Sequence, residues 1–234
     1  MWFYRYGTIT FFSIGTVLMG VLAVVQRKKY GLKPWQCVVF TLLLSAVGMA
    51  GVRLLAIVER WKDLLEGYTP GGMSFFGAVF LVPLLMPLLC RPFRLRRLQT
   101  LDLCAPCVAG IVSVMRINCW FTECCGGRTF EYMGRSFTPP TQIIDGTWDF
   151  LLMGLLLYLN LNGKREGASY PIFLVGYGVM RFLVEFLRET EKDWLYLSHG
   201  QWFSLLAIAI GALSIHRMGL WPRKMPVPKD KENA

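Results

Sequence analysis

Residues 36–58 read QCVVFTLLLSAVGMAGVRLLAIV, a stretch in which only Arg53 is charged. At a rise of about 1.5 Å per residue, a helix of this length crosses a hydrocarbon core about 30 Å thick. Similar apolar blocks lie at residues 8–25, 73–90, 99–121, 143–161, 169–187 and 202–220. The sequence therefore predicts an all-α, polytopic integral membrane protein with seven transmembrane helices.

The composition supports this fold class over a soluble one. The 234 residues are 54% hydrophobic and 17% charged, and the mean hydropathy is +0.44. A soluble protein of this size could not bury so many apolar residues in one core. We predict one seven-helix transmembrane domain over residues 1–221, and a disordered basic cytoplasmic tail over residues 222–234. The first block lacks a clear small-residue cleavage site and is predicted to be a retained span.

The basic residues predict the orientation of the chain. Segments QRKKYGLK, RPFRLRR and GKREG and the tail from His216 carry most of the 25 Lys and Arg residues. Because cytoplasmic loops are enriched in Lys and Arg, these segments are predicted to lie inside, with the N-terminus outside and the C-terminus cytoplasmic. The same bias accounts for the net charge of +10 without a nucleic-acid partner.

Charged residues within the predicted spans indicate a functional site, because an ionisable side chain is costly inside a membrane. Arg53 and Arg116 are each expected about 27 Å above the cytoplasmic end of their spans, with Arg181 at about 18 Å and Glu185 at about 24 Å. Three arginines from three helices are therefore expected in the outer half of the bilayer.

Arg181, Glu185 and Arg188 lie at i, i+4 and i+7, on one helical face. They could form an ion pair internal to that helix, with Arg188 extending to the membrane interface. One glutamate cannot neutralise the three intramembrane arginines, however. The anion available at that depth is a phospholipid phosphate, which a guanidinium group binds through two hydrogen bonds.

Several segments resemble the prolipoprotein diacylglyceryl transferase family in order and spacing. GGMSFFG (71–77) resembles that family's Gly-Gly-Met-Ser-Phe-His-Gly, and DLCAPCVAG (102–110) resembles the start of its fourth span. The stretch around Arg116 lies where the family signature begins with Gly-Arg. Three further segments match family motifs: PPTQIID (139–145), GYGVMRFLVEFLRE (176–189) and SHGQWFS (198–204).

The resemblance implies an enzyme that transfers the diacylglyceryl group of phosphatidylglycerol to the lipobox cysteine of a preprolipoprotein and releases glycerol phosphate. It implies a bacterial plasma membrane location, an active site toward the outer leaflet, and neither a cofactor nor a metal. Catalytic roles are expected for Arg116, Arg181, Glu185 and His199. Residues expected to bind the lipid or its phosphate are Arg53, Arg188, Gly71, Gly72, Gln142 and Gln201.

The chain departs from the family pattern at residues that matter for proton transfer. Phe76 replaces the histidine of the third span, and Pro139 replaces a histidine of the fifth segment. Cys119 and Cys124 stand where the signature has asparagine and glutamate. His199 could take over as the base, or it could be an interfacial histidine without a role. Nearby arginines could also favour the thiolate of the substrate directly.

The cysteines fall into two groups. Cys104 and Cys107 lie deep in a predicted span, where small apolar packing is the favoured interpretation. Cys119, Cys124 and Cys125 lie near the outer face, where disulfides persist. A disulfide, a reactive free thiol near the lipid site and a metal site are the three alternatives, in that order.

Other functions are also compatible with the sequence. A related lipid transfer to a different acceptor is compatible with the departures, as is a non-catalytic phospholipid-binding membrane protein. A transporter or channel is disfavoured because the sequence has no repeated halves and no ladder of charges through the full depth.

Overall fold

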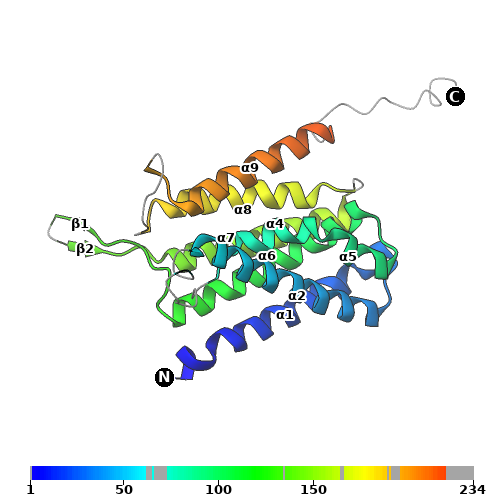
Figure 1. The fold of residues 1–234 in the computed structure, drawn as a ribbon, viewed down its shortest axis with the longest axis horizontal. Helices are drawn as coiled ribbons and strands as arrows, with labels where there is room; N and C mark the ends of the chain where they lie inside the picture. The colour runs from blue at the N-terminus through cyan, green and yellow to red at the C-terminus, as the bar shows by residue number, and fades with distance from the viewer. Residues whose placement is uncertain are drawn as a thin grey trace.

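The computed structural model describes residues 2–61, 65, 73–133, 135–163, 166–188, 190 and 196–219. Helices run side by side along its long axis (Figure 1). Their order is α1 (Trp2–Tyr30), α2 (Pro34–Glu59), α4 (Phe76–Leu84), α5 (Met86–Cys90), the 3₁₀ turn η1 (Arg91–Phe93), α6 (Arg97–Phe121), α7 (Thr141–Asn162), α8 (Ser169–Glu185) and α9 (His199–Arg217). Gly71, Gly72 and residues 222–234 lie outside the described residues.

A short hairpin interrupts the helices between α6 and α7. Strands β1 (Phe130–Tyr132) and β2 (Arg135–Phe137) pair antiparallel, with Phe130 opposite Phe137. The hairpin projects beyond one end of the helical body (Figure 1). We refer to this as the hairpin end.

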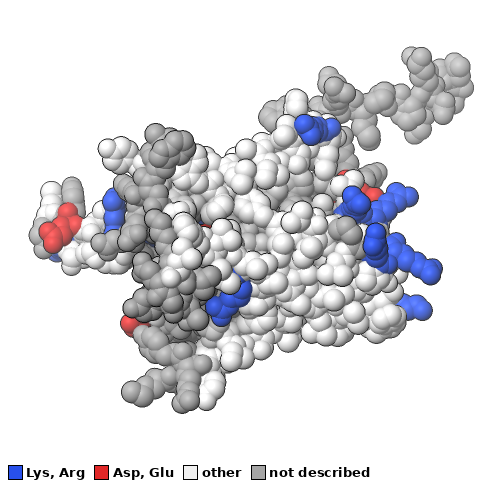
Figure 2. Space-filling model, viewed as in Figure 1, with Lys and Arg blue, Asp and Glu red and all other residues white. Residues whose placement is uncertain are grey.

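The described helices have the composition of a membrane protein. Four of them, α1, α2, α6 and α7, are long and apolar enough to span a bilayer. Large apolar side chains face outward, among them Val17 at 67% exposure and Leu84 at 72%. In Figure 2 a broad uncharged surface separates the two ends, and Lys and Arg gather at the end opposite the hairpin, which we call the basic end. Exposed apolar surface on this scale is unfavourable in water and favourable in lipid.

Helix α6 occupies the centre of the bundle and packs against α1, α7 and α8. Most of its apolar stretch is buried. Cys104 and Cys107 lie on it at 0% and 1% exposure, within the apolar core. The packing role predicted for these two cysteines is therefore consistent with their positions.

The third predicted span, residues 73–90, is not one continuous helix. It divides at Leu85 into α4 and α5. Pro83 lies inside α4, and a proline has no N–H to donate to the carbonyl four residues before it. The buried Tyr170 hydroxyl donates to that carbonyl, Val79 O, at 2.6 Å.

The same compensation occurs in α6, where Pro106 leaves the Asp102 carbonyl without a helical donor. Asn160 of α7 donates to that oxygen at 2.5 Å. The Asp102 carboxylate accepts from the backbone N–H groups of Gly167 at 2.6 Å and Ser169 at 2.9 Å, at the start of α8. Side chains from α6 and α7 thus satisfy the backbone at the basic end.

Close approach of α2 and α4 depends on two glycines. A Cβ atom placed on Gly77 would meet the backbone oxygen of Gly51 at 1.9 Å. Ser74 just before α4 donates its N–H to Val52 O at 3.3 Å. Gly77, the last residue of the GGMSFFG segment, therefore allows the backbones of α2 and α4 to approach closely.

Candidate functional site

Asp145 on the first turns of α7 lies between two arginines from neighbouring helices. Its Oδ2 is 3.2 Å from Arg116 Nη2 on α6 and 3.6 Å from Arg181 Nη1 on α8. The Asp145 side chain is 5% exposed, and those of Arg116 and Arg181 are 12% and 13% exposed. Asp145 on α7 therefore links Arg116 on α6 to Arg181 on α8, although these two arginines are far apart in the sequence.

A second carboxylate extends the cluster along α8. Glu185 Oε2 lies 2.8 Å from Arg181 Nη2 and 3.8 Å from Arg188 Nη1. The Arg188 side chain is only 11% exposed, so it is folded against Glu185 and does not extend to an exposed interface. We call Arg116, Asp145, Arg181, Glu185 and Arg188 the arginine cluster.

The arginine cluster retains unused hydrogen-bonding capacity. Arg116 Nε and Arg181 Nη1 are buried and have no hydrogen-bond acceptor among the described residues. The ion pairs join three guanidinium groups to two carboxylates, and these two donors stay without an acceptor in that arrangement. Buried guanidinium donors without an acceptor are a property of a site that binds an anion.

Asp145 and Asp149 are two residues that the sequence analysis missed. Asp149 lies one turn further along α7, is 3% exposed, and is close enough to Arg116 and Arg181 to interact with them electrostatically. The signal was present in the sequence, since TQIIDGTWD places the two carboxylates at i and i+4 on one face. Asp145 is also the last residue of the PPTQIID segment.

The start of α9 is anchored to the arginine cluster. Ser198 Oγ donates to Glu185 Oε1 at 2.9 Å, and a Cβ atom on Gly200 would lie 3.1 Å from that oxygen. His199, between these two residues, is exposed and begins α9. Gln201 is buried and accepts from Ser198 N–H at 3.0 Å, so its side-chain oxygen caps the helix.

The remaining predicted lipid ligands differ in position. Gln142 is buried at the start of α7, and its Nε2 donates to Cys124 O at 2.8 Å. Arg53 lies on an exposed face of α2, so its surroundings differ from those of the buried cluster. Gly71 and Gly72 cannot be placed, because they fall outside the described residues.

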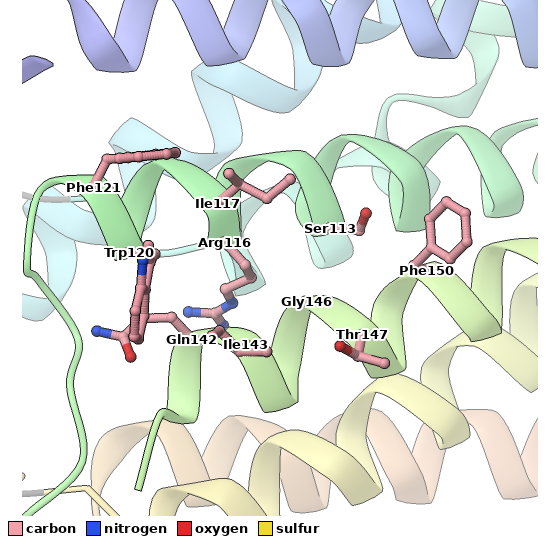
Figure 3. Close-up of a pocket in the computed structure, with 10 residues that line it drawn as sticks. All are labelled: Ser113, Arg116, Ile117, Trp120, Phe121, Gln142, Ile143, Gly146, Thr147 and Phe150. Atoms are coloured by element: carbon pink, nitrogen blue, oxygen red, sulfur yellow. The ribbon is translucent and has the colours of Figure 1, made fainter. Parts of the chain in front are cut away.

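A groove of about 360 Å³ opens between α6 and α7 beside the cluster. Figure 3 shows Arg116 reaching from α6 toward α7, with Trp120 and Gln142 at one end of the groove and Phe150 at the other. The other lining residues are Ser113, Ile117, Phe121, Ile143, Gly146 and Thr147. Gly146 permits the close packing here, since a Cβ atom would lie 3.1 Å from Arg116 Cβ. The groove combines apolar walls with one guanidinium group, which suits an amphipathic ligand.

Phe76 occupies an aromatic environment. It is 4% exposed and packs against Tyr177 at a ring-centroid distance of 5.5 Å and against Phe203 at 5.7 Å. Tyr177 in turn is close enough to Arg116 and Arg181 to interact with them electrostatically. Phe76 therefore lies behind Tyr177, near the arginine cluster, and contributes packing but no proton transfer.

Three cysteines converge beside the groove, where α6 ends. The Sγ atoms of Cys119, Cys124 and Cys125 all lie within 4.8 Å of one another, and all three are free thiols. Hydrogen bonds from Cys119 and Cys124 lower the pKa of the Cys125 thiol, despite the opposing effect of desolvation. We call these residues the cysteine cluster. The disulfide alternative is not present in this structure.

The loop that carries the cysteine cluster is also joined to the end of α8. Gly127 forms an isolated antiparallel bridge with Arg188, and Arg128 N–H donates to Leu187 O at 2.8 Å. The loop after α6 and the loop after α8 therefore meet beside the arginine cluster.

Comparison with known proteins gives a consistent result. The sequence model of the family described as prolipoprotein diacylglyceryl transferase matches residues 2–217. A phosphatidylglycerol–prolipoprotein diacylglyceryl transferase of Clostridium tetani is 28% identical over 228 residues, covering 89% of this chain and 90% of its own. A protein of that name from Acinetobacter baylyi is 32% identical over 164 residues, covering 64% of this chain and 59% of its own.

Proposed function

Since the chain belongs to the prolipoprotein diacylglyceryl transferase family, we propose that it transfers the diacylglyceryl group of phosphatidylglycerol to the lipobox cysteine of a preprolipoprotein. The observation that carries the proposal is the arginine cluster, in which three buried guanidinium groups share two carboxylates beside an open groove. The oxygens of a phosphodiester headgroup would accept from the buried Arg116 Nε and Arg181 Nη1 donors, which have no acceptor among the described residues.

The reaction breaks the bond between the glyceryl carbon and the phosphate oxygen. The acceptor sulfur attacks that carbon, a thioether forms, and the electron pair leaves with the phosphate of glycerol phosphate. Negative charge therefore builds up on the phosphate in the transition state. Arg116 and Arg181, already oriented by Asp145, would stabilise that charge without reorganising first.

The groove supports lipid access from the side of the bundle. Trp120, Phe121 and Phe150 are exposed around its rim, so acyl chains in the surrounding bilayer could remain in contact with apolar side chains while the headgroup reaches Arg116. A volume of about 360 Å³ holds a headgroup and the glyceryl carbons but not two acyl chains. Most of each acyl chain would therefore stay in the surrounding membrane during the reaction.

Proton transfer from the acceptor thiol is assigned to His199. Ser198 and Gly200 on either side of it lie against Glu185, so the imidazole belongs to the rim of the arginine cluster. Histidine exchanges a proton near neutral pH and is suited to accept one from a thiol. This assignment compensates for the loss of the family histidine at Phe76.

We also propose seven spans in a bacterial plasma membrane, with the N-terminus outside and the arginine cluster toward the outer leaflet. The proposal is supported by the separation of charge along the bundle, with Lys and Arg gathered at the basic end (Figure 2). The arginine cluster lies toward the hairpin end, near the last turn of α6. Under the positive-inside rule, the basic end is cytoplasmic.

The experiment is complementation of transferase-depleted cells, scored by the mass of a lipobox reporter peptide. A gain of one diacylglyceryl unit is the expected result. Arg181→Ala should lower the transfer rate about 100-fold or more, as loss of a donor to a developing anion does. The matched control is Arg217→Ala, which removes an exposed arginine at the end of α9. An Arg181→Ala rate equal to that of the control would rule out the arginine–phosphate assignment.

His199→Ala tests the base separately. We expect the rate at neutral pH to fall about 100-fold, with recovery as the pH is raised and the acceptor thiol ionises without help. An unchanged rate and pH profile would remove His199 from the mechanism. If the intact chain leaves the peptide mass unchanged while still binding phosphatidylglycerol vesicles, the non-catalytic lipid-binding alternative, suggested by Phe76, takes its place.

A further inference from the structure

The three sulfurs of the cysteine cluster have a spacing that a metal ion could bridge. All three Sγ atoms lie within 4.8 Å of one another. Four sulfur ligands around Zn²⁺ at about 2.3 Å are about 3.8 Å apart in a tetrahedron. Small side-chain rotations would therefore bring these sulfurs to coordination distance.

The backbone of the cluster is already fixed by the start of α7. Gln142 Nε2 donates to Cys124 O at 2.8 Å, and Thr141 Oγ1 donates to Cys125 O at 2.9 Å. Cys124 N–H donates to Cys119 O at 3.1 Å, which holds the loop against the last turn of α6. Thr122 Oγ1 lies 3.4 Å from Cys124 Sγ and can serve as an outer partner of that ligand. The site is thus organised before any ion binds.

Neither of the other interpretations uses all three thiols. A disulfide would join two of them and leave the third without a function. A single reactive free thiol likewise leaves the other two without a function, although all three sulfurs lie within 4.8 Å of one another. Three thiolates around a divalent cation carry one negative charge in total, and Arg116 and Arg188 are close enough to stabilise it.

We infer that Cys119, Cys124 and Cys125 bind a thiophilic divalent cation of the Zn²⁺ class, and that its fourth coordination position takes the sulfur of the acceptor cysteine. The metal-binding part stands on the cysteine cluster alone, whereas the role of the fourth position rests on the proposed transfer reaction. Three protein ligands with one open position are the usual form of a catalytic zinc site.

The chemistry of a coordinated thiol suits thioether formation. A free thiol has a pKa of about 8.5, and coordination to Zn²⁺ removes its proton outright. The proton passes to His199, the base assigned to this reaction, and the sulfur keeps the electron pair of the S–H bond. The sulfur then attacks the glyceryl carbon, the carbon–oxygen bond breaks, and glycerol phosphate leaves with the electron pair. No oxidant or reductant is needed.

The inference gives the departures from the family pattern a common explanation. Cys119 and Cys124 replace the asparagine and glutamate of the family signature, and Phe76 replaces its histidine. A chain that lost a proton-accepting histidine has gained soft ligands beside the same groove. Gln142, which lines the groove, joins its wall to the loop that carries Cys124.

The first test measures metal content in the full chain, purified in detergent after incubation with Zn²⁺ and then dialysed. We expect about one zinc per chain, and a loss of affinity in Cys119→Ser, Cys124→Ser and Cys125→Ser larger than the roughly 10- to 100-fold typical of an outer partner. Cys107→Ser, on the same helix as Cys119 but deep in the core, should retain the zinc. A disulfide among the three cysteines, or equal zinc in the cluster variants, overturns the inference.

The second test addresses the open position with Co²⁺ as the spectroscopic probe. A lipobox peptide with its cysteine should increase the sulfur-to-cobalt charge-transfer absorption of the Co²⁺-loaded chain, and the same peptide with serine should not. Equal spectra with both peptides overturn the role of the fourth position. Arg181→Ala should still bind zinc, so failure of the transferase proposal and failure of the metal site give different results.

Discussion

Asp145 is the residue on which the charges of Arg116 and Arg181 converge, although its place in the sequence does not reveal this. Arg116, Arg181 and Glu185 were predicted because each is costly within a span. Arg188 was predicted from its place on the helical face of Arg181 and Glu185, and the structure brings all four together. Asp145 is the third residue of its apolar block (143–161), near the membrane interface, where a carboxylate is common. Its ion pairs to α6 and α8 depend on tertiary packing that periodicity does not reveal.

Asp145→Asn should destabilise the protein and lower the transfer rate. The substitution leaves Arg116 and Arg181 buried without their shared carboxylate, and breaking one side of a buried ion pair costs about 3–5 kcal/mol. Thermal unfolding in detergent and the reporter assay measure the two effects. Asp145→Glu keeps the charge and is the control, which should retain most of both. Equal behaviour of the two variants would contradict the pairing role.

Phe76→His would restore the family residue without restoring its chemistry. The new imidazole would be buried against Tyr177 and Phe203, and burying a polar group among aromatic rings costs roughly 1–3 kcal/mol. We expect a lower unfolding temperature and no gain in transfer rate, with Phe76→Leu as the apolar control. A rise in rate would mean that the aromatic cluster tolerates a base at this position.

At the scale of elements, the apolar blocks located most helices closely. Block 36–58 corresponds to α2 (Pro34–Glu59), and block 143–161 to α7 (Thr141–Asn162). The break between α4 and α5 escaped prediction, because hydropathy does not register the missing N–H of Pro83. The hairpin β1–β2 also escaped prediction, since its strands are only three residues each.

Tyr170 and Pro83 should be thermodynamically coupled. Tyr170→Phe removes the donor to Val79 O and should cost about 1–3 kcal/mol, because that buried carbonyl then has no partner in its own helix. Pro83→Ala supplies a backbone N–H for the same carbonyl.

A double-mutant cycle in detergent measures this coupling. The cost of Tyr170→Phe should fall in the Pro83→Ala background. Additive effects of the two substitutions would show that the tyrosine hydroxyl does not compensate for the proline.

At the scale of the whole molecule, the two ends of the bundle should face different compartments. Ser136 in the hairpin and Lys28 near the end of α1 are both exposed and lie at opposite ends. In a background with Cys124 and Cys125 replaced by serine, a membrane-impermeant thiol reagent added to intact cells should label Ser136→Cys. Lys28→Cys should react only after the cells are lysed. The reverse pattern would invert the proposed orientation.

The ion pairs of Asp145 also constrain how the chain is inserted during synthesis. Arg116 on α6 and Arg181 on α8 each carry a charge that costs about 2.5–3.5 kcal/mol at the centre of an isolated inserting helix. Both are paired by the helix between them in the sequence, α7. The ribosome synthesises α6, α7 and α8 in that order. The free-energy cost of burying Arg116 therefore falls when α7 packs beside α6, and the cost of burying Arg181 falls when α8 packs beside α7. The three helices therefore enter the bilayer most favourably as one unit, and the charges of the site also guide its biogenesis.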